Sequence, residues 1–221
     1  MAGEKALVWD ETGKRFYETG TKKGVLYVQD SGGNYPTGVA WNGLTAVTEN
    51  PTGAEVTPLY ANDSKYLNLY SVEEFGATIE AYTSPKEFDV CDGSAELVKG
   101  VSLGQQKRKP FGFSYVTTIG NDTDGTAHGY KIHLVYGAMA SPSQKSYTTI
   151  NDSPEAMTLS WEITTTPVAV EGHDPTATIV IDSNEADPTK LKAFEDIIYG
   201  KEGTAARLPL PSEVKTLLSP S

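Results

Sequence analysis

The chain has 221 residues, with 18 lysines and arginines against 29 aspartates and glutamates and a net charge of −11. This length allows one sizeable β domain, or one domain with a small appendage. A protein that grips DNA presents a basic face that displaces counterions. The composition therefore argues against tight nucleic-acid binding, but it allows an acidic surface past which DNA slides. The only dense basic run is Lys107–Lys109.

Cysteine usage and hydropathy narrow the class further. The single cysteine, Cys91, excludes an intramolecular disulfide, and we expect it to be a small buried residue because no base for a nucleophile is evident. No apolar run approaches the length of a membrane span. The N-terminal MAGEKALVWDETGKR lacks the apolar centre of a signal peptide. The expectation is a protein that folds in a cytosol without membrane insertion.

Alternation of apolar and polar residues with period two predicts a mainly β fold. In AMTLSWEITTTPV, Met157, Leu159, Trp161 and Ile163 alternate with polar residues. Clusters of Gly, Asn and Asp between the runs predict short turns, which together favour an antiparallel β-sandwich or open barrel. The predicted strands are Gly24–Gln29, Val39–Thr48, Tyr66–Tyr70, Glu74–Thr83, Phe111–Ile119, Gly129–Ala138, Tyr147–Ile150, 157–163 and Ala177–Asp182.

One flanking helix is predicted over Pro188–Tyr199, where Asp187 is a natural N-cap and Gly200 can close the C-terminus. Its apolar stripe, which should lie on a sheet, consists of Leu191, Phe194, Ile197 and Ile198. A weaker pattern predicts a helix over Ser84–Cys91 with Ser84 as its cap. Residues 212–218 could add a further turn or two. We expect one domain over residues 1–200 and a C-terminal arm over 201–221.

A long polar insertion, Asn50–Lys65, separates two strand-like runs. Loops of this length are uncommon in compact domains and are usually functional or mobile. Pro51, Gly53 and Pro58 are expected to limit regular pairing, while Leu59 and Tyr60 could anchor the loop in a neighbouring subunit. A loop that packs on its own chain or stays disordered is the alternative.

No constellation of catalytic chemistry stands out. His128 and His133 are five residues apart on a strand, so they point to opposite faces, which is poor for a shared metal. Residues 122–125 faintly resemble the start of a calcium loop, but a hairpin turn is the better interpretation. We find no phosphate loop, nucleophile elbow or dinucleotide fingerprint. The sequence therefore predicts no catalytic residue, no cofactor and no metal.

Two segments resemble the major tail protein, or tail tube protein, of long, non-contractile-tailed bacteriophages. One is ENPTGAEVTPLYANDSKY with the following EEFGATIEAYTSPKEFDVCDG, and the other is KLKAFEDIIYGKEGTAARLPLPSEVKTLL. The resemblance extends from about Val25 to the end of the chain. It implies a β-sandwich that forms hexameric rings, which stack helically into a tube with a continuous inner barrel. It also implies a structural virion protein without enzymatic activity, assembled in the host bacterial cytoplasm. The implied partners are further copies of itself, the tape measure protein, and tail tip and tail terminator proteins, and DNA passes through the lumen without specific binding.

The resemblance assigns roles to three sets of residues. It implies that the inter-strand loop bridges one ring to the next, and the candidate residues are Asn50, Pro51, Glu55, Leu59, Tyr60, Asp63 and Lys65. It implies that Glu74 and Glu80 face the lumen and make it acidic, although an ordinary solvated strand face would have the same pattern. It implies that the C-terminal arm is anchored in a neighbouring subunit by Leu208, Leu210, Leu217 and Leu218, although these leucines could equally fold back on their own domain.

Two other function classes remain. A non-catalytic β-sandwich that binds carbohydrate or a cell surface would use exposed aromatic side chains on one sheet face, and Trp41, Tyr66, Tyr70 and Tyr82 are the candidates. An enzyme is the third class, and no acid/base, nucleophile or metal constellation favours it.

Overall fold

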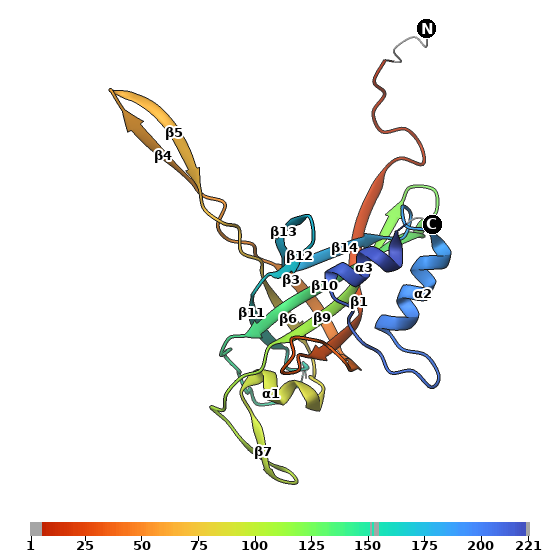
Figure 1. Cartoon of the computed structure of the whole chain (residues 1–221). Coiled ribbons are helices and arrows are strands. Elements are labelled where there is room, and N and C mark those ends of the chain that lie inside the picture. Colours follow the sequence, from red (N-terminus) through yellow and green to blue (C-terminus); the bar gives the residue numbers. More distant parts are fainter. Residues whose placement is uncertain (1–5, 151, 153–154, 220–221) are drawn as a thin grey trace.

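A curled antiparallel sheet forms the centre of the chain in the computed structural model, which describes residues 6–150, 152 and 155–219 (Figure 1). Among these residues the sheet has eight strands in the order β2–β1–β9–β10–β11–β6–β3, and β14 also pairs with β10. The expectation of a mainly β, antiparallel fold with a flanking helix is confirmed. The strands are β1 (Phe16–Val28), β2 (Gly38–Ala40), β3 (Leu44–Glu49), β6 (Gly76–Ala81), β9 (Phe111–Asn121), β10 (Gly125–Ala140), β11 (Leu159–Thr165) and β14 (Thr178–Asp182).

Strand β10 changes partners along its length, and this bends the sheet. Its first part, Lys131–Val135, pairs with β14, whereas Ala138–Ala140 pair with β11. The switch occurs at Gly137, whose φ of +58° suits glycine and whose added Cβ would lie 2.2 Å from the carbonyl oxygen of Thr166. The bend brings β3 round towards β1, so the sheet curls into an open barrel.

Each face of the central strands covers a separate core. On β9, the alternate residues Phe111, Phe113 and Tyr115 point into the barrel, where they pack with Trp41 and Trp161. Residues of the other face, such as Val116, pack beneath the C-terminal helices. That second core includes Tyr27, Ile132, Leu134, Tyr136, Leu191, Phe194, Ile198 and Leu208. Both faces of β9 are therefore buried over most of its length.

Helix α2 (Pro188–Ile198) matches the predicted flanking helix. The carboxylate of Asp187 accepts hydrogen bonds from the amides of Thr189 and Lys190 at 2.9 and 3.0 Å, as expected of an N-cap. Leu191, Phe194 and Ile198 are buried, while Ile197 is only half-buried. Helix α3 (Pro211–Leu218) follows and lies beside α2 (Figure 1).

The prediction of one helix over Ser84–Cys91 is wrong in detail. The segment contains a 3-10 turn, η1 (Lys86–Phe88), and a single α turn, α1 (Asp89–Asp92). Pro85, which makes no side-chain capping bond, stands at the start in place of Ser84. The pattern was too short for a stable helix, and the turn is held because Phe88 and Cys91 are buried in the barrel core.

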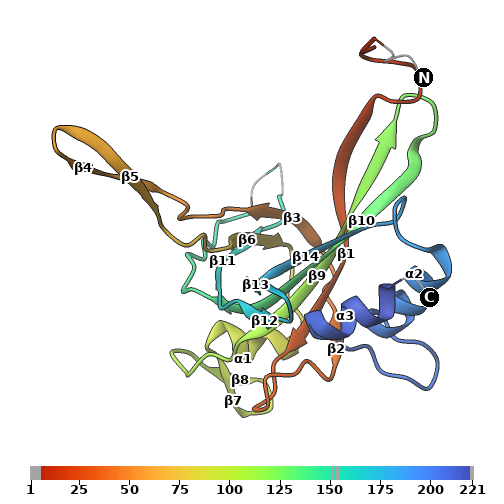
Figure 2. The same cartoon turned by 45° about the horizontal axis from the view of Figure 1, so that its top comes forward.

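Three two-stranded hairpins complete the chain. They are β4–β5 (Val56–Ala61 and Ser64–Tyr70), β7–β8 (Ala95–Val98 and Val101–Leu103) and β12–β13 (Val168–Val170 and His173–Thr176). Figure 2 shows β4–β5 standing far out from the barrel, while β7–β8 leaves the body in a different direction, near α1.

Several predicted strands differ from the structure. The run Val39–Thr48 is two strands, because a turn at Trp41–Gly43 folds Trp41 over the barrel core. Residues 147–150 form no strand, since no neighbouring segment pairs with them, and Tyr147 is 79% exposed. Strand β6 begins at Gly76 rather than at Glu74. In the described part of the chain, no helix combines the length and apolarity needed to cross a membrane.

Candidate self-assembly surfaces

The predicted inter-strand loop is a regular hairpin in the structure. Strands β4 and β5 pair from Val56 opposite Tyr70 to Ala61 opposite Ser64, with an irregularity after Leu59. The expectation that Pro51, Gly53 and Pro58 limit regular pairing is wrong for Pro58, which stands in the ladder opposite Asn68. Both strands are edges, so a proline whose missing N–H would face solvent leaves no partner unsatisfied.

The base of this hairpin is fixed to the barrel. Thr52 and Glu74 exchange two backbone hydrogen bonds of 2.9 and 2.8 Å, and the Asn50 amide bonds to Gly76 at 2.8 Å. At Gly53, φ is +86° and an added Cβ would lie 2.1 Å from the carbonyl oxygen of Val72, so only glycine lets the two arms approach this closely. The hairpin therefore leaves the body in a defined direction.

Beyond its base the hairpin has no intramolecular cover. Every residue from 51 to 74 is exposed except Asn68, which is half-buried. Apolar side chains lie on both faces, since Val56 stands opposite Tyr70 on one and Leu59 opposite Leu67 on the other. The exposed large apolar residues are Val56, Leu59, Tyr60, Tyr66, Leu67, Leu69, Tyr70 and Val72. A two-stranded hairpin is marginal in water by itself, and an apolar surface of this kind marks an interaction site.

The structure places the predicted loop residues in different parts of this unit. Asn50 belongs to the base, where its side-chain amide donates to the hydroxyl of Thr78 at 3.2 Å. Glu55 begins the paired part, since its amide bonds to the Ser71 hydroxyl. Asp63 is in the tip turn, with a positive φ of 56°. The remaining candidates are Pro51 in the base, Leu59 and Tyr60 on β4, and Lys65 on β5.

A second surface is the outer face of the sheet β3–β6–β11. In β6, Ala77, Ile79 and Ala81 are buried in the barrel core, whereas Thr78 and Glu80 point away from it, which is the period-two alternation of a half-buried strand. Helices α2 and α3 lie on the other side of the molecule (Figures 1 and 2). This face is left without a helical cover.

Register adds one carboxylate that the site prediction missed. Glu162 on β11 stands opposite Thr78 and is exposed, and Ser160 stands opposite Glu80. The signal was present in the sequence, because Glu162 alternates with the buried Trp161 and Ile163. Strands β3, β6 and β11 contain no lysine or arginine, so the acidic groups on this face have no cationic neighbour within it. Glu74 lies beyond the start of β6, at the hairpin base.

The C-terminal leucines lie on their own domain. Leu208 is buried and forms an isolated bridge with Tyr35, and Leu210, Leu217 and Leu218 are partly buried against the same core. Arg207 and Glu213 pair side by side, and this ion pair lowers the pKa of Glu213. In the isolated chain the segment takes the folded-back arrangement that the sequence left open.

A cluster of titratable groups lies where the barrel opens between β1, β3, β9 and β10. The Tyr115 hydroxyl donates to Glu49 at 2.5 Å, and the ring of Tyr115 stacks on that of His133 with centroids 4.5 Å apart. Burial lowers the pKa of His133, although the carboxylates of Glu49 and Glu18 oppose this shift. Burial also raises the pKa of Tyr115, and its bond to Glu49 acts in the same direction. The cluster ties the long N-terminal strand to β3 and keeps Tyr115 protonated.

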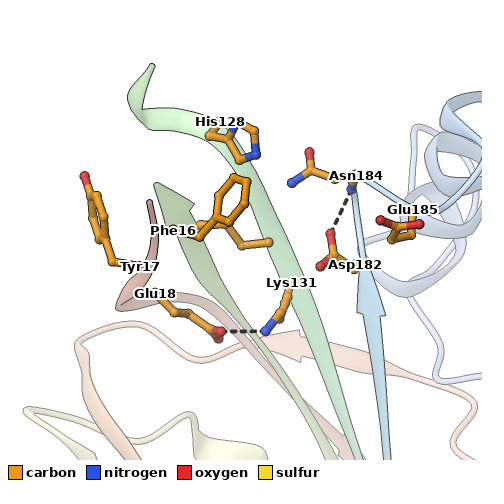
Figure 3. A pocket seen from close by; sticks show the side chains of 9 residues that line it. Phe16, Tyr17, Glu18, His128, Lys131, Asp182, Asn184 and Glu185 are labelled. Carbon is orange, nitrogen blue, oxygen red and sulfur yellow. Dashed lines mark hydrogen bonds and ion pairs between the residues drawn. The ribbon is translucent and has the colours of Figure 1, made fainter. Parts of the chain in front are cut away.

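Beside this cluster lies a depression of about 500 Å³, lined by residues of β1, β9, β10 and β14 and of the turn that follows β14 (Figure 3). Lys131 donates to Glu18 at 2.7 Å, and Phe16 packs against His128 with ring centroids 5.1 Å apart. The Glu18 and Lys131 charges therefore neutralise one another across the strands, whereas Asp182 and Glu185 leave the rest of the lining acidic. Among residues 6–150, 152 and 155–219, no three His, Cys, Asp or Glu side chains are grouped so as to hold a metal ion.

Comparisons with known proteins find fold-level neighbours only. No family model matches the chain, and no curated protein matches it. Among solved structures, it is similar to a chain of the cryo-EM structure of the anti-feeding prophage (AFP) baseplate, with a TM-score of 0.36 and 10% identity over 79% of this chain and 97% of that one.

Two further neighbours come from an extracellular contractile injection system, PVC. A chain of its sheath-tube complex in the extended state has a TM-score of 0.30 and 12% identity over 72% of this chain and 88% of that one. A chain of its sheath/tube terminator in the extended state has a TM-score of 0.29 and 12% identity over 80% and 99%. These TM-scores and identities do not assign the chain to a family.

Proposed function

We propose that this protein is a structural subunit of a phage-type tail tube, which assembles into stacked rings and has no enzymatic role. The observation that carries the proposal is the β4–β5 hairpin, a rigidly based arm with apolar side chains on both faces and no cover from its own chain. Such an arm gains stability only when another molecule covers it. A second copy of the chain is the partner that a homopolymer supplies.

The remaining surfaces suit a ring. Strand β14 pairs only with β10, and β2 only with β1, so each presents an open edge among the described strands. Open edges template pairing with another chain. Contacts of this kind between unlike surfaces close when the rotation completes a circle, whereas stacking contacts do not close and generate a filament. Hexameric closure with helical stacking is the arrangement we propose.

The acidic outer face suits a conduit. DNA carries about one charge per 1.7 Å of its axis, and basic walls would hold it through counterion release. If the β3–β6–β11 face lines the lumen, Glu80 and Glu162 repeat around each ring without a cation in those strands. Screening confines their repulsion to about 8 Å at physiological salt. DNA would pass such a wall without being bound, and the tape measure, tail tip and terminator proteins would be the further partners in the virion.

The carbohydrate-binding alternative is weakened because its main aromatic candidate, Trp41, is buried. Trp41 is 3% exposed and packs in the barrel core against Phe88, with ring centroids 4.6 Å apart. Its indole N–H donates to the backbone of Thr83 at 2.9 Å. Tyr66 and Tyr70 are on the projecting hairpin and Tyr82 is at the end of β6, so the four aromatics form no common platform on a sheet face.

The test is negative-stain electron microscopy of the purified protein at high concentration, with light scattering on a sizing column. We expect hollow rings or tubes of uniform width. The matched variant replaces residues 55–71 by a short Gly-Ser turn, which keeps the Thr52–Glu74 bridge and removes both strands of the hairpin. It should stay folded by circular dichroism and lose stacking. Two results together would contradict the proposal. One is a wild-type protein that remains monomeric at every concentration, and the other is a hairpin-deleted protein that is still incorporated into phage particles.

A further inference from the structure

The chain carries two projecting hairpins of opposite charge. The first is the β4–β5 arm, residues 51–74, which holds four carboxylates and one lysine. The second is the basic hairpin, residues 93–109, which contains β7–β8 and holds four cations and one carboxylate. The overall charge of the protein is strongly acidic, so this local excess of cations departs from the rest of the chain.

Three of the four cations of the basic hairpin have no ionic partner among the described residues, whereas Arg108 pairs with Asp92 at 3.6 Å. Lys99, Lys107 and Lys109 are exposed and form no ion pair with a described residue. The single carboxylate, Glu96, is already paired with Lys86 at 2.7 Å, and this contact lowers the pKa of Glu96. Arg108 is also engaged, since its guanidinium donates to the Ala140 carbonyl at 2.9 Å. Three lysines therefore remain available to an outside partner.

Apolar side chains accompany these lysines. Leu97 and Val98 on β7 are 61% and 59% exposed, and Val101 and Leu103 on β8 are 47% and 41% exposed. The base of the segment is held by the Gln106 amide, which bonds to the Gly93 carbonyl at 2.9 Å. The basic hairpin thus exposes both apolar side chains and unpaired lysines, a combination that occurs in protein interfaces.

The β4–β5 arm presents the complementary combination. Its carboxylates, Glu55, Asp63, Glu73 and Glu74, are exposed and form no ion pair with a described residue, and its aromatic and aliphatic side chains lie between them. In both views the arm and the basic hairpin leave the body in divergent directions (Figures 1 and 2). The arm of one chain therefore does not cover the basic hairpin of the same chain.

We propose that the β4–β5 arm of one copy docks on the basic hairpin, residues 93–109, of a second copy. Apolar burial supplies the affinity, and the opposite charges set the partner and the register. The two surfaces are different and lie on different sides of the body, so each copy offers one of each to successive neighbours. Repetition of such a contact builds a stack when the rotation between successive copies does not close on itself. This inference rests on the proposed self-assembly and names the surface that receives the arm.

Charge reversal tests the pairing. One variant carries Lys99→Glu and Lys107→Glu, and the other carries Glu55→Lys and Glu73→Lys. Each alone places like charges across the contact, and we expect the protein concentration needed for assembly to rise at least about tenfold. An equimolar mixture should assemble again, because each variant's arm then matches the other variant's basic hairpin. A matched control, Lys201→Glu with Lys215→Glu, changes two exposed lysines elsewhere and should assemble normally.

Zero-length carbodiimide cross-linking supplies a second readout that does not need long polymers. In a mixture of isotopically labelled and unlabelled wild-type chains, mass spectrometry should find links between chains that join Lys99, Lys107 or Lys109 to Glu55, Asp63 or Glu73. The docking pair would be overturned if each charge-reversed variant by itself assembled at wild-type concentrations. It would also be overturned if the links between chains were confined to other surfaces. Wild-type protein that gives these links without rings or tubes would instead count against the tail-tube function and sustain the contact.

Discussion

The β9–β10 and β4–β5 hairpins are both antiparallel ladders, and their burial differs almost completely. β9–β10 lies between β1 and β14, with the barrel core on one face and α2 on the other, and Phe113 and Leu134 are fully buried. Among the described elements, no other strand pairs with β4–β5, and Tyr66 is 71% exposed. Both hairpins have antiparallel backbone pairing, so it is side-chain burial that separates a structural core from a projecting arm.

Amide hydrogen exchange should show this difference most strongly. In the unassembled chain we expect amides of β4–β5 to exchange with almost no protection. Amides at the centre of β9–β10 should require opening energies near the global stability, typically about 5–15 kcal/mol. Mass spectrometry of peptides from the two hairpins measures both. After assembly the β4–β5 amides should become protected, and equal protection of the two hairpins in the monomer would refute the comparison.

Matched aromatic truncations should differ in the free energy of unfolding. Phe194→Ala removes a fully buried ring from the helix that covers β9–β10 and should cost about 3–5 kcal/mol. Tyr66→Ala on the arm should change monomer stability by less than about 0.5 kcal/mol. Urea denaturation of the two variants at one temperature measures both. The arm would have an unrecognised intramolecular role if Tyr66→Ala proved as costly as Phe194→Ala.

A smaller loss of stability is expected at the N-cap of α2, the helix that covers β9–β10. Asp187→Ala removes the acceptor for the Thr189 and Lys190 amides and should lower stability by about 1 kcal/mol. Asp187→Asn keeps an acceptor oxygen and serves as the control. The thermal midpoint of each variant gives the result. A loss shared equally by both substitutions would show that the carboxylate charge, rather than the cap geometry, provides the stabilisation.

The opposite face of β9–β10 should show a weak pH dependence through His133. Burial holds its pKa below the ordinary value of 6.5, so the unfolded chain binds a proton more readily than the folded one. This contribution to stability is complete above about pH 6.5 and is lost as the pH falls through the folded pKa. We expect a loss below about 1 kcal/mol between pH 7.5 and 5.5, measured as a fall in the urea midpoint. His133→Gln should remove this increment, and an unchanged pH dependence in the variant would assign it elsewhere.

The sequence by itself determined the elements whose pattern is local. Alternation in residues 157–163 predicted that Trp161 and Ile163 share one face, and both are buried, because a strand places successive side chains on opposite faces. Asp187, Pro188 and the apolar stripe of α2 predicted that helix and its cap. The position of the insertion between two strands was also evident, although its sequence was interpreted as a polar loop.

Tertiary structure decided what depends on distant partners. Trp41 is buried because a turn folds it between Phe88 and Trp161. Glu162 joins Glu80 on one face only because β11 pairs with β6, and Leu208 is buried because the last segment returns to Tyr35. These outcomes depend on contacts across long stretches of chain, which local periodicity does not encode.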